Sequence, residues 1–274
     1  MEPVEHGIMD AGLIIALLAL GAAVGFAAGM LGIGGGMLLV PFMTIILSLK
    51  GFPEAHVVHM AIATSLATIM FTSVSSVRAH HQRGAVLWKV VALLAPGILI
   101  GSWIGPWIGA KMNSSALAVF FSVFVALSAS QMLLDRKPLA SRNLPGALGM
   151  SGVGAVIGIL SGLVGAGGGF VSVPFMVWCN VRMHNAVATS AALGFPIALA
   201  GTLSNIHFGM KVTGLPAGSF GFIYLPALLV ISIASVTTAS LGARFAHKLP
   251  VKSLKNIFAV MLYTLAAYML YKAV

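Results

Sequence analysis

Two uncharged stretches are too long to cross a lipid bilayer once, and they constrain the fold of this chain more than any other feature. Residues 11–49 and 143–181 contain no Asp, Glu, Lys or Arg. As one continuous helix, each would extend for roughly 55 Å, whereas the hydrocarbon core of a bilayer is about 30 Å thick. Each stretch must therefore fold back on itself, and each contains a cluster of glycines where it can do so.

The composition excludes an ordinary soluble domain. Of the 274 residues, 59% are hydrophobic and 7% are charged, whereas about a quarter are charged in a soluble domain. The net charge of +10 fits basic cytoplasmic loops, so we expect no nucleic-acid partner. The first ten residues lack the basic region of a cleaved signal peptide, so we expect the first apolar run to be retained. A single cysteine, Cys179, excludes an internal disulfide and a cysteine-built metal cage.

The uncharged runs divide the chain into ten apolar segments, of which the glycine-broken second and seventh are short. We expect them at residues 12–31, 36–48, 57–77, 86–109, 115–134, 145–164, 169–179, 186–206, 219–242 and 255–272. Glycines recur at a spacing of four on three of these segments, which predicts close packing between helices. They are residues 21, 25 and 29, residues 101, 105 and 109, and residues 154, 158 and 162.

The chain is internally duplicated. Gly25–Met43 (GFAAGMLGIGGGMLLVPFM) aligns without gaps on Gly158–Met176 (GILSGLVGAGGGFVSVPFM). Residues 59–65 (HMAIATS) likewise match residues 184–190 (HNAVATS), and residues 117–133 match 254–270 more loosely. Five segments thus recur in each half. We expect two membrane repeats, residues 1–138 and 139–274, within one integral membrane domain.

An odd number of segments per repeat predicts that the second repeat is inverted in the membrane relative to the first. The basic residues agree with ten crossings and both termini outside the cell membrane. In that topology 11 of the 15 Lys and Arg residues lie inside, and Lys50, Lys111, Lys211 and Lys272 lie outside. Whether the two short segments cross fully or re-enter stays open.

The glycine clusters are the first candidate site for a ligand. A helix that begins after such a cluster starts with unpaired backbone amides and a positive dipole end. Two such starts that face each other near the midplane would bind a small anion without a buried cation. The alternative is a tight turn that serves only close helix packing. The candidate residues are Gly34, Gly35, Gly36, Gly167, Gly168 and Gly169.

Polar side chains inside the segments are the second group of candidates. Hydroxyls that lie several residues inside their segments can donate to an anion, or they can bond the carbonyl of the preceding turn. No Asp or Glu lies inside a segment, so a metal site and a carboxylate relay are both unexpected. Proton coupling would then fall to histidines, which are otherwise ordinary interfacial residues, or to the substrate itself. The candidate donors are Thr64, Ser65, Thr189, Ser190 and Asn205, and the candidate histidines are His59, His184 and His207.

These motifs resemble those of the TauE/SafE family of sulfite and organosulfonate permeases. The glycine and Val-Pro signature stands at Gly32–Pro41 and again at Gly165–Pro174. The Ala-x-x-Thr-Ser signature follows at Ala61–Ser65 and Ala186–Ser190. The resemblance covers nearly the whole chain. It implies a multi-pass transporter of the cytoplasmic membrane that moves small sulfur-containing anions, commonly outward.

The sequence therefore predicts an all-α integral membrane protein of two inverted repeats of five segments. We expect a secondary transporter that works by alternating access, with a small anion and the lipid bilayer as partners, and with homo-oligomers allowed. We expect neither an enzyme nor a cofactor. An anion channel or gated pore is the alternative, since it would use the same glycine-lined helix starts.

Overall fold

The computed structural model describes residues 11–31, 35–134, 143–246 and 251–273. In these ranges the chain folds into ten α-helices and one antiparallel pair of two-residue strands. The helices of the first half are α1 (Ala11–Leu31), α2 (Gly36–Leu49), α3 (Val57–Gln82), α4 (Trp88–Gly109) and α5 (Ser114–Leu134). The second half holds α6 (Ala147–Val164), α7 (Gly169–Trp178), α8 (Met183–Gly209), β1 (Ser219–Phe220), β2 (Ile223–Tyr224), α9 (Leu225–Ala246) and α10 (Val251–Ala273).

Several helix boundaries differ from the sequence-based expectation, and two differ most. The helix α3 continues to Gln82, whereas the sequence predicts its end at residue 77. It ends just before Gly84, whose φ of 63° is left-handed and terminates a helix easily. The ninth segment begins as a hairpin at residue 219, and its helix starts only at Leu225, because Gly218 and Gly221 have φ values of 85° and 59° that favour a tight turn.

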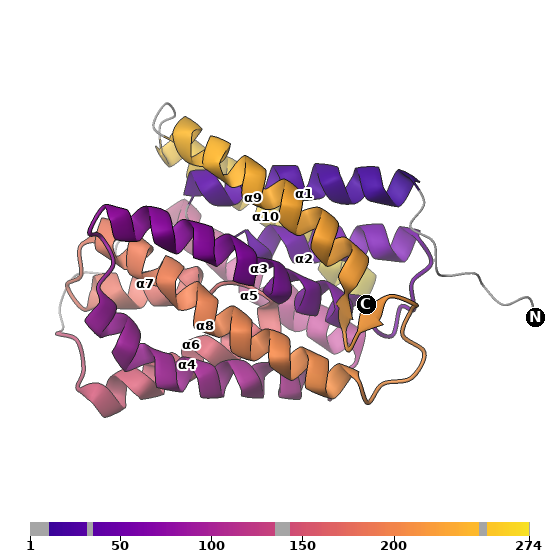
Figure 1. Ribbon diagram of the computed structural model, residues 1–274, viewed down its shortest axis with the longest axis horizontal. Helices are drawn as coiled ribbons and strands as arrows, with labels where there is room; N and C mark the ends of the chain where they lie inside the picture. The colour runs from indigo at the N-terminus through magenta and orange to yellow at the C-terminus, as the bar shows by residue number, and fades with distance from the viewer. Residues whose placement is uncertain (1–10, 32–34, 135–142, 247–250, 274) are drawn as a thin grey trace, which may run out of the picture.

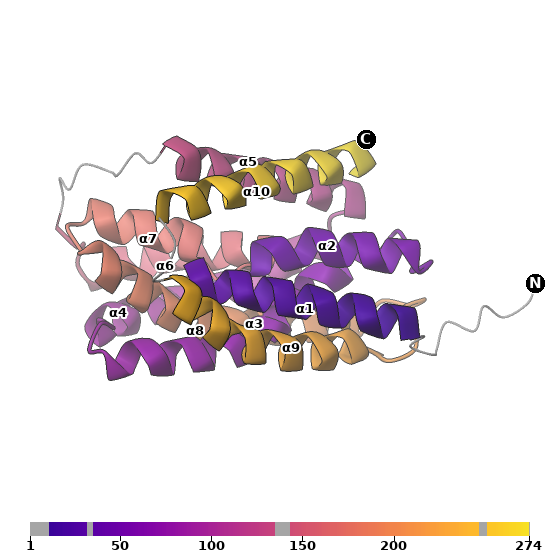
Figure 2. The ribbon, with the colours of Figure 1, turned by 90° about the horizontal axis from the view of Figure 1, so that it is seen from above.

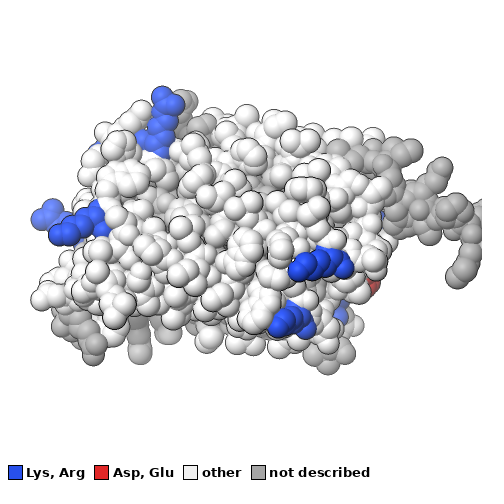
Figure 3. Space-filling model, turned by 60° about the horizontal axis from the view of Figure 1, so that its bottom comes forward, with Lys and Arg blue, Asp and Glu red and all other residues white. Residues whose placement is uncertain are grey.

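The architecture is that of an all-α integral membrane protein. Among the described residues, seven helices are long and apolar enough to cross a bilayer, and α2, α7 and residues 225–239 of α9 form shorter apolar helices. In Figure 3 the Lys and Arg side chains lie toward the two ends of the long axis, with a broad uncharged band between them. Such a band is what a bilayer core requires of the surface that it surrounds.

Helices of the first half pack mainly against helices of the second half. The principal pairs are α1 with α9, α4 with α6, α3 with α8, and α5 with α10. In Figure 1 the α1 and α9 pair lies along one long edge and the α4 and α6 pair along the other. Figure 2 shows α5 and α10 together on a third side, next to α2. The two halves are therefore interleaved.

Glycines allow two of these pairs to approach to backbone contact, as their spacing predicts. A Cβ built at Gly97 of α4 would lie 1.7 Å from the carbonyl oxygen of Ser151 on α6, and one at Gly154 of α6 would lie 2.3 Å from that of Leu94. On the opposite edge, a Cβ at Gly25 of α1 would lie 2.4 Å from Cα of Ser235 on α9. Without a hydrophobic driving force inside lipid, such close packing is a main source of helix association.

The basic residues fall into two groups at opposite ends. At one end, the Asn185 side chain donates to the carbonyl of Ala85 at 2.9 Å, which brings the start of α8 to the loop between α3 and α4. At the other end, Lys272 pairs with Glu54 at 3.0 Å, so α10 ends beside the loop after α2. The start of α1 lies at this second end too (Figure 2).

We predict that Gly97→Ala lowers the melting temperature of the detergent-solubilised protein by about 5 °C or more, because overpacking a close contact costs about 1–3 kcal/mol. Gly152→Ala on α6 is the matched control, since a Cβ there meets nothing within 4 Å. It should leave the melting temperature unchanged or slightly raised. Equal melting temperatures for the two variants would contradict the packing described for α4 and α6.

Candidate functional site

The two short helices begin inside the molecule, each after a glycine in the left-handed conformation. Gly35 precedes α2 with φ of 61°, and Gly168 precedes α7 with φ of 77°. Other residues rarely adopt this conformation, so these positions require glycine. Gly34, the remaining member of the predicted site, lies outside the described residues.

The lengths of α2 and α7 place their starts at mid-depth. The 14 residues of α2 and the 10 residues of α7 extend for about 21 Å and about 15 Å. Together they are about as long as one crossing of a hydrocarbon core of about 30 Å. The first ends next to Lys50 and the second close to Arg182, which belong to opposite ends of the molecule.

The two helix starts are in direct contact. A Cβ built at Gly36 would lie 2.5 Å from the carbonyl oxygen of Gly165 and 3.0 Å from Cα of Ala166. Gly36 and residues 165–169 are buried. The predicted meeting of the two glycine turns in the interior therefore agrees with the geometry of the described residues.

Backbone amides at these starts have no hydrogen-bond acceptor in the part of the chain that the structure describes. They are the amides of Gly36 and Met37 on α2 and of Gly169 and Phe170 on α7. A buried N-H group without a partner costs about 1–3 kcal/mol. Four such donors, close to two positive helix ends, form a local environment that an anion would stabilise.

Ser65 and Ser190 both lie at the turns, with different partners. The Ser65 hydroxyl on α3 donates to the carbonyl oxygen of Gly165 at 2.8 Å, which ties the first half to the turn of the second. Ser190 on α8 accepts a hydrogen bond at 2.8 Å from Ser172 of α7. Ser172 carried no signal in the sequence because its counterpart in the first repeat, Leu39, is apolar.

The two threonines bind the starts of other helices. The hydroxyl oxygen of Thr64 accepts the amide of Tyr224, just before α9, at 3.1 Å. That of Thr189 accepts the amide of Leu87, just before α4, at 3.0 Å. Each threonine thus caps a helix of the opposite half. The internal duplication carried a signal for this role. Leu87 and Tyr224 are 137 positions apart, which is also the spacing between the matched residues Leu117 and Leu254, so they are equivalent positions of the two halves.

Ile69 of α3 was missed by sequence reasoning, yet it contacts a glycine of each turn. Its Cδ1 atom lies 2.9 Å from a Cβ built at Gly36, and its Cγ2 atom lies 3.7 Å from one built at Gly167. The side chain is 3% exposed. An isoleucine in an apolar helix carries no sequence signal for such a position.

The other predicted residues lie apart from this contact. The Asn205 side chain donates to the carbonyl of Gly201 in its own helix at 2.8 Å. His59 is buried, its Nε2 atom lies 3.0 Å from the carbonyl oxygen of Gly109, and its ring stacks on Phe222. Its Nδ1 atom has no partner within the described residues. His184 and His207 are exposed.

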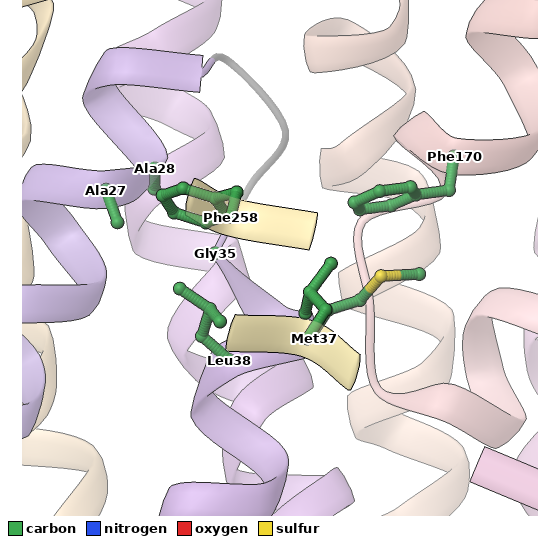
Figure 4. A pocket seen from close by; sticks show the side chains of 8 residues that line it. Ala27, Ala28, Gly35, Met37, Leu38, Phe170 and Phe258 are labelled. Atoms are coloured by element: carbon green, nitrogen blue, oxygen red, sulfur yellow. The ribbon is translucent and has the colours of Figure 1, made fainter. Parts of the chain in front are cut away.

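An apolar pocket adjoins the start of α2 (Figure 4). Its volume is about 10 Å³, roughly enough for one water molecule. It is bordered by Gly35 and Met37 at the start of α2, by Phe170 from the first turn of α7, and by Phe258 of α10. The surface that lines it is entirely apolar, so it is a small apolar gap between the two helix starts and α10.

Comparison with known proteins gives consistent matches over almost the whole chain. The family model described as "Sulfite exporter TauE/SafE" matches residues 17–269. A "Probable membrane transporter protein" of Haemophilus influenzae is 36% identical over 261 residues, which cover 94% of this chain and 98% of that protein. A protein of the same description from Methanocaldococcus jannaschii is 27% identical over 270 residues, covering 94% and 96%. No solved structure matches the chain.

We predict that Thr64→Val and Thr189→Val each lower the free energy of unfolding by about 1–2 kcal/mol, because each removes the acceptor of an amide that directly precedes a helix, a buried one for Thr64 and a partly buried one for Thr189. Thr64→Ser and Thr189→Ser keep the oxygen and should recover most of the loss. Thr264→Val on the exposed face of α10 is the control for the same change. Denaturant unfolding in detergent measures all five, and valine variants as stable as the control would refute the capping role.

Proposed function

Because the chain belongs to the TauE/SafE sulfite exporter family, we propose that this membrane transporter moves a small anion, sulfite or an organosulfonate or another sulfur-containing anion, by alternating access. The proposal places the anion between the starts of α2 and α7. In the proposal Thr64, Ser65, Thr189 and Ser190 support this site, whereas Asn205 lies apart from it.

The observation that carries the proposal is the contact between the buried starts of α2 and α7, whose first two amides have no acceptor among the described residues. The stretches that hold both turns, residues 11–49 and 143–181, contain no Lys or Arg. Neutral donors and helix dipoles would hold an anion more weakly than a buried cation would. Weak binding suits a transporter, which must release its substrate on the far side.

Alternating access requires two halves that can rock against each other, and we assign these to inverted repeats at residues 1–138 and 139–274. Reciprocal packing supports the assignment, since α1 contacts α9 as α6 contacts α4. The threonine caps are reciprocal in the same sense, from α3 to α9 and from α8 to α4. This exchange of equivalent elements is what a two-fold axis in the membrane plane produces.

The close contact of the turns favours a transporter over a channel. The carbonyl of Gly165 sits where a Cβ of Gly36 would be, and Ile69 packs against both turns, so the described residues hold the proposed site closed. A transporter passes through such an occluded state in each cycle, whereas an open pore does not need one.

The sulfur-containing anion is taken from the family. The amides of α2 and α7 would bind its charged oxygens. For proton coupling we assign His59 as the first candidate, because it is buried and its Nδ1 atom lacks a partner in the described ranges. The exposed His184 and His207 are weaker candidates.

We predict that Gly167→Ala abolishes most anion flux with little loss of stability. A Cβ at Gly167 meets only Ile69, at 3.7 Å, so the fold accepts it, but the methyl group enters the proposed site. Gly152→Ala on α6 is the control, since a Cβ there meets nothing within 4 Å and the residue is exposed. Counterflow of sulfite and sulfonates into proteoliposomes measures the flux.

Three results of that experiment would count against the proposal. Wild-type flux in Gly167→Ala would remove the glycine turns from the site. Flux without counterflow or trans-stimulation would favour the channel. The lack of any anion flux in the wild-type protein would overturn the transport of these anions altogether.

We also predict that both termini face outward from the cytoplasmic membrane. The start of α1 and the end of α10 lie at one end of the molecule (Figure 2), and the basic-residue count favours the opposite end inside. Epitope tags added at either terminus should be digested by protease applied to intact spheroplasts. If both tags are digested only after the membrane is opened, both termini lie inside and the predicted orientation is wrong.

A further inference from the structure

The two repeats differ at one position next to the glycine turns. Ile69 on α3 corresponds to Gly194 on α8, at the same offset of 125 positions that relates Thr64 to Thr189. Ile69 contacts Gly36 and Gly167, as described above. Gly194 also approaches Gly167, because a Cβ built there would lie 3.9 Å from the carbonyl oxygen of Gly167.

These two residues lie next to each other beside the turn that precedes α7. A Cβ at Gly194 would lie 4.0 Å from Cγ2 of Ile69 and 3.6 Å from Cβ of Ser73. All its contacts within 4 Å would be ordinary van der Waals contacts. The α3 side of the turns is therefore filled by a branched side chain, while the α8 side has room for one methyl group.

We propose that Ile69 and Gly194 together set the largest anion that the site accepts, with Ile69 as the wall and Gly194 as the space for the substituent of the anion. The inference rests on the proposed function, because it takes the glycine turns as the anion site. The charged oxygens face the amides of α2 and α7, and the organic substituent extends toward Gly194. The site then accepts anions with a short substituent, because Ile69 limits the space on the α3 side.

The physical basis is steric exclusion in a closed apolar space. Ile69 packs against both turns and is 3% exposed, so a change in its size alters the space beside the turns. One methylene group too many in such a space costs about tenfold or more in rate.

The test uses the straight-chain series from methanesulfonate to butanesulfonate, which keeps the charge and headgroup constant. Counterflow rates are measured in proteoliposomes for the wild type, Ile69→Val, Ile69→Ala and Gly194→Ala. We expect Ile69→Ala to raise the rate for the longer sulfonates relative to methanesulfonate by about tenfold, with Ile69→Val between it and the wild type. Gly194→Ala should shorten the accepted chain and lower the ratio of ethanesulfonate to methanesulfonate by a similar factor.

Two matched variants control for general effects on packing. Ile233→Ala makes the same change on the surface of α9, where the side chain is 66% exposed. Gly152→Ala makes the same change as Gly194→Ala where nothing lies within 4 Å. Neither should alter the chain-length profile. If Ile69→Ala does not fold, Ile69→Val and Gly194→Ala still test the inference, because both changes are small.

The outcomes separate this inference from the function on which it rests. Sulfonate flux with one chain-length profile in all variants would overturn the role of Ile69 and Gly194 and leave the transporter intact. Opposite shifts for the two positions would support the inference. A wild-type protein that moves none of these sulfonates and no sulfite would overturn the proposed function, and this inference with it.

Discussion

The structure depends on how backbone amides are satisfied inside a membrane where water cannot reach them. Every polar backbone group at that depth needs a partner within the protein or from a ligand. Within the described residues, this rule is not met at Gly36 and Gly169, where two helices begin in the interior and their first amides have no acceptor. The hydroxyl of Ser65 donates a hydrogen bond to the neighbouring carbonyl oxygen of Gly165. The amides left over are the chemical basis of the proposed site.

The halves of the chain stabilise each other at this site and do not form it separately. Thr64 and Thr189 each cap a helix of the opposite half, and the closest helix pairs also join the two halves. A movement of one half would therefore shift caps, turns and packing together. This coupling is the physical reason why a small anion at the turns could favour one arrangement of the halves over another.

Equivalent positions in the two repeats have not kept equivalent environments. His59 is buried against Phe222, while its counterpart His184 is exposed. Ile69 fills the space between the turns, while its counterpart is Gly194. The duplicated hydrogen-bonding residues support the fold from both sides, and the positions that differ give the two sides of the site different shapes and proton-binding groups.

The sequence by itself determined the all-α membrane architecture and nearly all helix positions, because hydropathy, glycine clusters and charge act over neighbouring residues. It also predicted that the two glycine turns would be linked, through the repeat that both share. Only the tertiary structure decided that Thr64 and Thr189 bond helix starts far along the chain and that Ile69 lies between the turns. Those roles depend on contacts between residues separated by 33 to 160 positions, and no local pattern encodes which of many apolar or hydroxyl side chains will meet.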